Sequence, residues 1–264
     1  MKVFGADFSG ARDPSKGIYY AEGFLQENLL KINRVVHCDD RLDLLSAIHF
    51  SKAPWGLDFP FSLPVQAQSS LQVNNWGELL DLALDYSRAD FERVTGSSII
   101  SRCEGRCQSH SICCRVVDAS IGSYSPLKKT NPNMRAMTYA GLKLLSYLRS
   151  LGNRVYPFDP LDQNLARVYE VYPSYTWSQV ELPRSTNVER FTGRFQQRYG
   201  FKISFTNSFC HPECIDAADA VVACVTLGYS MYLYGLDQDW SQQHSWIGKN
   251  EWEHRFTEGM IVKF

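Results

Sequence analysis

Four segments of this chain place an acidic residue inside a run of apolar residues. Asp7 lies within Val-Phe-Gly-Ala-Asp-Phe, Asp58 within Trp-Gly-Leu-Asp-Phe-Pro-Phe, and Glu170 within Arg-Val-Tyr-Glu-Val-Tyr-Pro. The fourth segment, Asp-Ala-Ala-Asp-Ala-Val-Val-Ala, contains both Asp216 and Asp219. A buried carboxylate costs several kcal/mol unless it is paired or bound to a metal. Any fold of this chain must supply partners for these acids, and we expect them to converge on one cation site.

The spacing of the apolar residues predicts an α/β fold, with a sheet of mixed direction and helices on both faces. Three short strand patterns in succession predict an antiparallel meander, and a short apolar run at residues 54–59 predicts a central strand buried on both faces. We predict strands at residues 2–8, 17–23, 29–37, 54–59, 153–158, 167–172 and 258–264. We predict helices at residues 40–50, 76–94 (one helix or a pair), 134–151, 187–199 and 213–228.

Length and composition bound the class of protein. The 264 residues, 44% of them apolar, predict a single domain over residues 1–264, with an insertion at about residues 95–125. Residues 101–204 carry a formal net charge of +8, whereas the segments before and after them carry −4 and −5. A basic middle favours an anionic partner near a cation site, although an uneven solvated surface explains the same numbers.

The chain gives no sign of secretion or of a membrane anchor. Its N-terminus lacks a basic start followed by an apolar core, so we predict no signal peptide. The longest apolar stretch, residues 217–236, is interrupted by Asp219, Gly228 and Gly235, which predicts a buried helix rather than a membrane span. Eight cysteines in a chain of this size favour reduced thiols. We therefore expect a cytoplasmic protein.

The acids have the chemistry of a hard-metal site. Asp216 and Asp219 are three residues apart on a predicted helix and share one face, while the other three acids lie on predicted strands. Such a carboxylate cage suits Mg²⁺ or Mn²⁺, and one or two ions can activate a water for phosphodiester cleavage. Each acid alone is better explained as a helix cap, a turn acid or a salt-bridge partner. The prediction depends on the set, and the choice between Asp216 and Asp219 stays open.

The ordered motifs resemble a known family. Gly-Ala-Asp-Phe-Ser-Gly, Gly-Leu-Asp-Phe-Pro-Phe-Ser-Leu-Pro, Tyr-Glu-Val-Tyr-Pro-Ser and Asp-Ala-Ala-Asp-Ala-Val-Val-Ala are similar to those of a domain family of unknown function, whose members are predicted nucleases with an RNase H-like fold. The resemblance runs from about residue 3 to the C-terminus. It implies an RNase H-like fold, nucleic acid as the partner, and metal-site roles for Asp7, Asp58, Glu170 and either Asp216 or Asp219.

Cysteines crowd into the predicted insertion, where this chain departs from that family. Cys103, Cys107, His110 and Cys113 have the spacing of a loose four-ligand zinc site. The spacing differs from that of standard Cys-x2-Cys pairs, and adjacent Cys113 and Cys114 cannot easily bind one ion. Paired or buried thiols therefore remain the alternative to a structural zinc ion.

Basic residues supply candidate contacts to a phosphate backbone. Arg190, Arg194 and Arg198 recur at every fourth position of the predicted helix 187–199, which places them in one stripe. A solvated helix face explains the same spacing. Lys128, in Ser-Pro-Leu-Lys, is a candidate contact to the scissile phosphate.

Three functions fit these features. The first is a metal-dependent phosphodiesterase acting on nucleic acid. The second is a phosphotransferase, because Asp7-Phe8-Ser9-Gly10 resembles the first phosphate loop of actin-like and sugar-kinase folds, which makes Ser9 a candidate substrate contact. No glycine-rich adenosine motif follows late in the chain, as that second function requires. The third is a non-catalytic binding or scaffold module.

Overall fold

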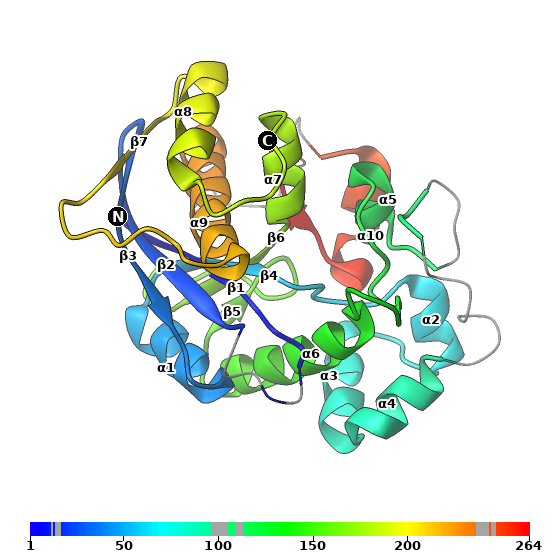
Figure 1. Cartoon of the computed structure of the whole chain (residues 1–264). Coiled ribbons are helices and arrows are strands. Elements are labelled where there is room, and N and C mark those ends of the chain that lie inside the picture. Colours follow the sequence, from blue (N-terminus) through cyan, green and yellow to red (C-terminus); the bar gives the residue numbers. More distant parts are fainter. Residues whose placement is uncertain (12, 14–16, 97–104, 109–112, 236–242, 244–246) are drawn as a thin grey trace.

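A mixed sheet forms the centre of the molecule (Figure 1). The computed structural model describes residues 1–11, 13, 17–96, 105–108, 113–235, 243 and 247–264. Its sheet has the order β5-β6-β4-β1-β2-β3-β7, and β8 pairs with β6 beside this path. The strands are β1 (Lys2–Asp7), β2 (Tyr19–Gln26), β3 (Leu29–His37), β4 (Pro54–Asp58), β5 (Arg154–Val155), β6 (Arg167–Val171), β7 (Lys202–Phe205) and β8 (Ile261–Val262).

The strand directions confirm the predicted meander and the mixed sheet. β1, β2 and β3 pair antiparallel in succession, whereas β4 pairs parallel with β1 and β6 pairs parallel with β4. β4 lies in the middle of the sheet and its first four residues are buried, as its short apolar run predicts. β7, which the sequence did not predict, pairs parallel with β3 at the far edge.

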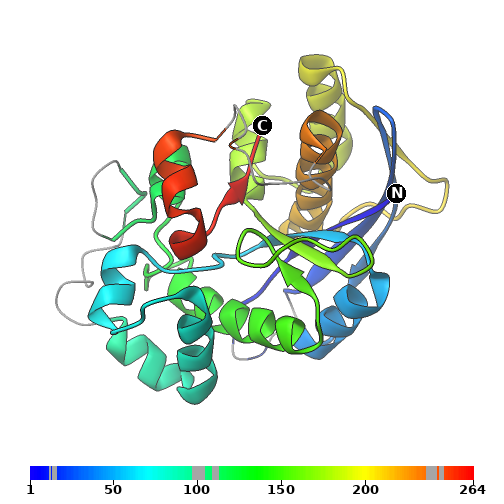
Figure 2. The same ribbon diagram turned by 180° about the vertical axis from the view of Figure 1, so that it is seen from behind.

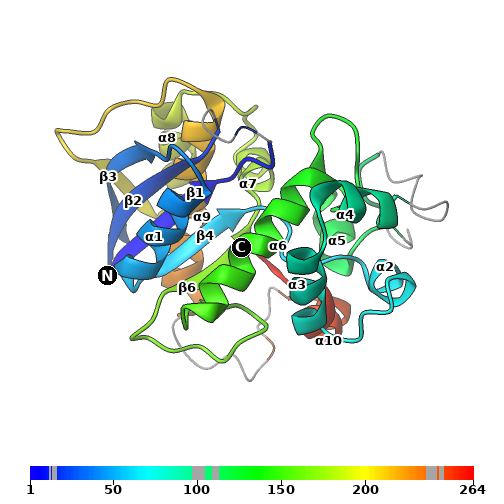
Figure 3. The ribbon, with the colours of Figure 1, turned by 90° about the horizontal axis from the view of Figure 1, so that it is seen from below.

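Helices cover both faces of the sheet. The described helices are α1 (Arg41–Ser51), α2 (Val65–Ser70), α3 (Trp76–Asp85), α4 (Arg88–Val94), α5 (Val116–Ile121), α6 (Met134–Ser150), α7 (Pro173–Gln179), α8 (Val188–Tyr199), α9 (Ile215–Tyr234) and α10 (Lys249–Glu258). From behind, α1 and α6 lie on one side of the sheet and α7, α8 and α9 on the other (Figure 2). The view from below shows α1 and α6 in front of the strands, with α3 and α4 next to α6 (Figure 3).

Local signals explain where several helices begin and end. The Asp40 side chain accepts hydrogen bonds from the backbone N–H groups of Leu42 and Asp43 and so caps α1. Ser87 caps α4 in the same way, which divides the predicted helix 76–94 into α3 and α4. α8 ends at Gly200, whose φ of 68° is the left-handed conformation that glycine adopts most easily. The short helices α2, α5, α7 and α10 have too few turns for a clear apolar period, and the sequence did not predict them.

α9 is a core helix that packs directly on the strands. A Cβ atom at Gly5 would lie 2.0 Å from the backbone nitrogen of Cys224, so only glycine allows β1 to approach α9 this closely. α9 is long and apolar enough to cross a membrane, but 83% of its most apolar window is buried inside the protein. It therefore has the burial of a core helix, as predicted, while the cytoplasmic location stays a prediction.

Candidate metal centre

The register of the sheet brings Asp7 and Asp58 together. β1 and β4 are parallel, and Asp7 is directly opposite Asp58 at the carboxyl ends of both strands. Side chains alternate between the two faces of a strand. Val3 belongs to the core beneath α9, whereas Phe4 and Ala6 belong to the core on the α1 and α6 side. Asp7 therefore faces α9, and its parallel neighbour faces the same way.

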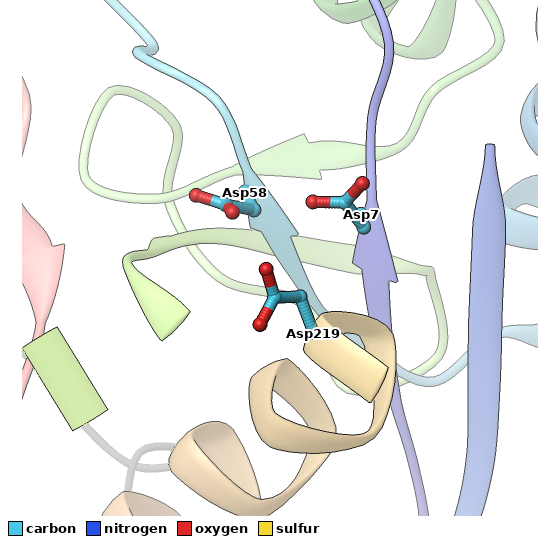
Figure 4. Close-up of side chains that lie close together, drawn as sticks. All are labelled: Asp7, Asp58 and Asp219. Carbon is cyan, nitrogen blue, oxygen red and sulfur yellow. The ribbon is translucent and has the colours of Figure 1, made fainter. Parts of the chain in front are cut away.

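α9 brings Asp219 to the same point. Cys224 and Ala223 pack on Gly5, and α9 runs antiparallel to β1. The step from Ala223 back to Asp219 is about 6 Å along a helix, and the step from Gly5 to Asp7 is about 6.6 Å along a strand. The two carboxylates therefore arrive at the same level, and in Figure 4 the side chains of Asp7, Asp58 and Asp219 point into one space.

These three aspartates form the group that we call the carboxylate group. Each offers one carboxylate oxygen, and the three oxygens lie within 4.8 Å of one another. Asp219 is fully buried, Asp7 is 7% exposed and Asp58 is partly exposed. Since the three come from two strands and a helix that are far apart in sequence, the fold itself assembles the group. Oxygen ligands in this number and at this separation are what a hard divalent cation prefers.

Burial and like charge oppose ionisation of the group. Burial raises the pKa of Asp58 to about 8, and the charge of Asp219 adds to the shift. The pKa of Asp7 lies well above its usual range, first because of burial and then because of Asp58 and Asp219. Burial also raises the pKa of Asp219. A cation placed between these oxygens would favour their charged forms and reverse these shifts.

Arg184 is the described cation that acts on this group. Its guanidinium forms an ion pair with Asp219, and its side chain is 43% exposed. Its positive charge lowers the pKa of Asp7, Asp58 and Asp219, against the larger effect of burial. The indole Nε1 of Trp177 donates a hydrogen bond of 2.8 Å to the other oxygen of Asp219 and so fixes its orientation. One partly exposed arginine therefore faces three acids.

Asp216 lies outside the carboxylate group. It is half-buried in the first turn of α9, and burial raises its pKa while Arg184 lowers it. Its charge still reaches Asp7, whose pKa it raises. Of the two acids that the sequence left open, the structure places Asp219 within ligand distance of Asp7 and Asp58.

Glu170 lies on the other face of the sheet. β4 and β6 are parallel, and Glu170 is directly opposite Leu57 rather than Asp58. Leu57 belongs to the core on the α1 and α6 side, so Glu170 points away from α9. It accepts hydrogen bonds from both Nη atoms of Arg115, at 2.8 and 2.5 Å, and from the backbone N–H of Phe61. The acid that the sequence assigned to the metal thus has an arginine as its partner.

The pair of Arg115 and Glu170 belongs to a buried network, which we call the Arg115 network. Arg115 also donates to both oxygens of Asp118, at 2.8 and 2.7 Å, and all three side chains are at most 3% exposed. The carboxylate of Glu258 accepts hydrogen bonds from the backbone N–H groups of Val65 and Val116. The network ties α2, α5, α10 and β6 together through complete hydrogen bonding.

Lys128 and Ser9, which the sequence predicts to contact a phosphate, form hydrogen bonds within the protein. The Nζ atom of Lys128 donates to the carbonyl oxygens of Thr130, Asn131 and Pro132 at 3.2, 2.6 and 3.4 Å, and the side chain is 3% exposed. An ammonium has three donors, so these carbonyls use all of them. Ser9 accepts a hydrogen bond of 3.2 Å from the backbone N–H of Ala11 and shapes the loop after β1.

The predicted basic stripe lies on the solvent side of α8. Arg190, Arg194 and Arg198 are all exposed, whereas Phe191 and Phe195 face the core. Arg198 forms an ion pair of 2.8 Å with Glu181, and Arg194 donates to Gln197. The spacing was thus interpreted correctly as one helix face, and its role in binding stays a prediction.

The expectation of reduced thiols is wrong for part of the insertion. Cys107 and Cys114 form a disulfide, with Cα atoms 5.7 Å apart, and Cys113 is also disulfide-bonded. The two cysteines are seven residues apart in sequence, and this spacing alone could not show that their sulfurs meet. Bonded sulfurs of this kind are not thiolate ligands, so zinc binding stays a prediction for the reduced chain. Cys103 and His110, the other predicted ligands, lie outside the described residues.

Sequence reasoning missed the cations and indole that complete these sites. Arg184, Arg115 and Trp177 each contact a predicted acid, but they lie in segments without a motif. A buried carboxylate is unfavourable without a cation or hydrogen-bond donor, and this was the signal in the sequence that such partners exist. It could not say which arginine satisfies which acid.

Comparison with models of known families, with curated proteins and with solved structures finds no match for this chain. The assignment of the carboxylate group therefore depends on its geometry and chemistry alone.

Proposed function

We propose that this chain is a divalent-metal-dependent nuclease with an RNase H-like fold. The observation that supports it most is the carboxylate group, in which three buried or half-buried acids share one space with one partly exposed arginine. An antiparallel meander followed by parallel strands, with helices on both faces, is the framework that the family resemblance implies. The basic stretch at residues 101–204 suits a polyanionic substrate.

The donor set fits Mg²⁺ or Mn²⁺ better than a softer metal. Asp7, Asp58 and Asp219 offer oxygen atoms, and the described residues place no cysteine or histidine in the same group. The oxygens lie close enough to share one ion or to bridge two. When bound, such ions lower the pKa of a water and stabilise the leaving oxygen of a phosphodiester.

The residues of the chain would divide the remaining work. Asp7 is paired with Asp58 across β1 and β4, and the charges of Asp58, Asp219 and Asp216 all raise its pKa, so a bound cation would favour its charged form. Trp177 holds Asp219 in one orientation through its indole N–H. Arg184 is long, partly exposed and always charged, so it would contact a non-bridging phosphate oxygen once its contact to Asp219 is released. Glu170 would stabilise the fold through Arg115 and would not bind the metal.

Metal binding and cleavage by Asp7→Asn and Asp58→Asn variants test this proposal. Each substitution keeps the side-chain size but removes one charged ligand. We expect each to weaken Mn²⁺ binding, measured by calorimetry, and to lower Mg²⁺-dependent cleavage of labelled single-stranded and duplex DNA and RNA by at least about a hundredfold. The same assays with the four substrates would identify the preferred nucleic acid.

The matched control is Asp85→Asn, at an exposed position of α3. It changes the net charge equally but lies outside the carboxylate group. Glu170→Gln serves as a second comparison, because it alters a buried acid of the opposite face. Cleavage that survives in both Asp7→Asn and Asp58→Asn would refute the nuclease assignment. A scaffold function would then account better for the chain.

A further inference from the structure

A second site lies on the other face of the sheet from the carboxylate group. An open pocket of about 390 Å³ is lined by Gly10 and Ala11 after β1, by the N-terminal parts of α1 and α4, and by residues of α6 between Tyr139 and Tyr147. Its walls include three basic side chains, two tyrosines and several leucines. It is the pocket beside the Asp-Phe-Ser-Gly segment, and none of its lining residues belongs to the carboxylate group or to the Arg115 network.

Positive charge gathers in this pocket in excess of its acidic partners. The Nη2 atom of Arg41 donates hydrogen bonds to the carbonyl oxygens of Ser9 and Ala11, at 3.0 and 2.5 Å. Its Nε atom is buried and has no hydrogen-bond partner within the described part of the chain. Arg88 donates to the carbonyl of Gly10 at 3.0 Å and pairs with Glu92.

Lys143 is the third cation. Its ammonium lies 5.5 Å from the centre of the Tyr139 ring, and its shortest described polar contact is 3.4 Å to the hydroxyl of that ring. Over the described ranges, neither Arg41 nor Lys143 forms an ion pair with a carboxylate. The pocket thus has N–H donors without a carboxylate partner, and donors of this kind bind phosphate oxygens.

Apolar surface lies beside this charge. Leu42 is 63% exposed and Tyr147 is 47% exposed, although both line the pocket. The ring of Tyr139 is held in place, because its hydroxyl donates a hydrogen bond of 2.8 Å to the carbonyl of Tyr86. Fixed aromatic rings next to cations are typical of surfaces on which nucleic-acid bases stack while the backbone phosphates are held. An inorganic anion has no apolar surface that could pack against these side chains, whereas a nucleotide base has one.

The pocket is close to the carboxylate group along the chain. Gly10 and Ala11 line it, and they follow Asp7 by three and four residues, a span of at most about 14 Å. A Cβ atom at Gly10 would lie 2.4 Å from the backbone of Met137, so Gly10 packs directly against α6. A strand that passes over the end of β1 would therefore reach both sites within a few nucleotides.

We propose that this pocket binds one nucleotide of a single-stranded nucleic acid, with a phosphate between Arg41, Arg88 and Lys143 and the base against Tyr139, Tyr147 and Leu42. The inference builds on the proposed function, because it places the same substrate on both faces of the end of β1. Arg41 and Arg88 also hold the loop, so Lys143 and Tyr147 are the residues that report on binding without a change in the loop.

Fluorescence anisotropy of a labelled oligothymidylate octamer, measured in EDTA, tests the pocket independently of cleavage. We expect Lys143→Glu to weaken binding by at least about tenfold at low salt and to reduce the slope of log affinity against log salt by about one. Tyr147→Ala should weaken binding severalfold and leave the salt slope unchanged. The control, Lys202→Glu, makes the same change of charge at an exposed position of β7, on the far edge of the sheet, and should bind the octamer like the unmodified chain.

Free thymidine monophosphate and inorganic phosphate, used as competitors, identify the source of the phosphate. The proposal requires both to compete more weakly than unlabelled octamer. Octamer binding that is equal in Lys143→Glu and Lys202→Glu overturns it, and so does a mononucleotide that binds more tightly than the octamer. If Lys143→Glu loses binding but the chain cleaves nothing, the pocket stands and the nuclease proposal fails. If Asp7→Asn abolishes cleavage while Lys143→Glu binds normally, the reverse holds.

Discussion

The carboxylate group and the Arg115 network lie on opposite faces of the same sheet, and both begin as acids in apolar segments. In the Arg115 network, Asp118 and Glu170 share an arginine that is itself 1% exposed, and every contact is a hydrogen bond within the protein. In the carboxylate group, three acids share Arg184, which is 43% exposed and contacts only Asp219 among the three. Both sets have fewer arginines than acids, but each acid of the Arg115 network pairs closely with its arginine, whereas Asp7 and Asp58 form no ion pair within the described residues.

This difference distinguishes acids that stabilise the fold from acids that can bind a ligand. A buried acid with a complete set of partners cannot take up a ligand without losing them, so we expect the Arg115 network to act on the stability of the fold. Burial raises the pKa of both Glu170 and Asp58, but Arg115 lowers it at Glu170 through a close ion pair, whereas Asp58 has no described ion pair and can gain free energy from an external cation. The absence of a close cation at Asp7 and Asp58 within the described residues, rather than burial itself, marks the site that we propose to be functional.

The largest effect that tests this contrast is the loss of Arg115. We expect Arg115→Met to lower the free energy of unfolding by ~3–5 kcal/mol, because it leaves Glu170 and Asp118 buried without their cation. Urea denaturation followed by circular dichroism measures the change. Arg93→Met removes an exposed ion pair with Asp90 and should cost less than about 1 kcal/mol. Equal losses in the two variants would mean that the network does not stabilise the fold.

The carboxylate group should respond to substitution in the opposite direction. The pKa of Asp58 is about 8 in the folded chain and 3.8 in its ordinary state, so between these values the folded form binds more protons than the unfolded form. The free energy of unfolding therefore falls as pH rises through this window. Asp58→Asn removes that titration. Between about pH 5 and about pH 8, we expect the free energy of unfolding of this variant to fall by ~1–3 kcal/mol less than that of the unmodified chain.

Denaturation midpoints at several pH values, in EDTA, measure this slope. Asp85→Asn, on the exposed face of α3, should keep the slope of the unmodified chain. An Asp58→Asn variant whose stability falls as steeply as that of the control would contradict a raised pKa at this position. Asp58 would then not differ in this respect from the paired acids of the Arg115 network.

Much of the framework was predictable because its signals are local. The meander of β1, β2 and β3, the central position of β4 and the helices α6 and α8 follow from spacing and end signals within each segment. Gly228 shows where such signals fail: it lies within α9 rather than at its end. A Cβ atom there would lie 3.1 Å from the side chain of Leu30, so this glycine serves close packing between α9 and β3.

The site was predictable only in part, because the face of a side chain depends on strand register. Asp7, Asp58 and either Asp216 or Asp219 were predicted to converge, and the structure brings Asp7, Asp58 and Asp219 together. Glu170 was assigned to the same set, but its pairing with Leu57 turns it to the other face. A shift of one residue in that pairing would have placed it beside Asp58. Register is set by contacts between distant segments, and no pattern within the segment reveals it.

The smallest expected effect concerns Arg184, the residue that makes the carboxylate group differ from the Arg115 network. Its guanidinium contacts Asp219 and would repel a divalent cation held by the same oxygen atoms. We expect Arg184→Met to tighten Mn²⁺ binding by about tenfold near pH 8, where protons compete less for the carboxylates than at lower pH, and to lower cleavage at saturating metal through loss of a phosphate contact. Calorimetry and cleavage assays on the same preparation separate the two effects.

Arg190→Met is the matched control for this change, because Arg190 is exposed on α8 and has no contact with the carboxylate group. It should leave the affinity for Mn²⁺ unaltered. If Arg184→Met weakens Mn²⁺ binding instead, the arginine supports the ligands more than it opposes the cation. Its role would then be that of Arg115, and the two faces of the sheet would differ in exposure alone.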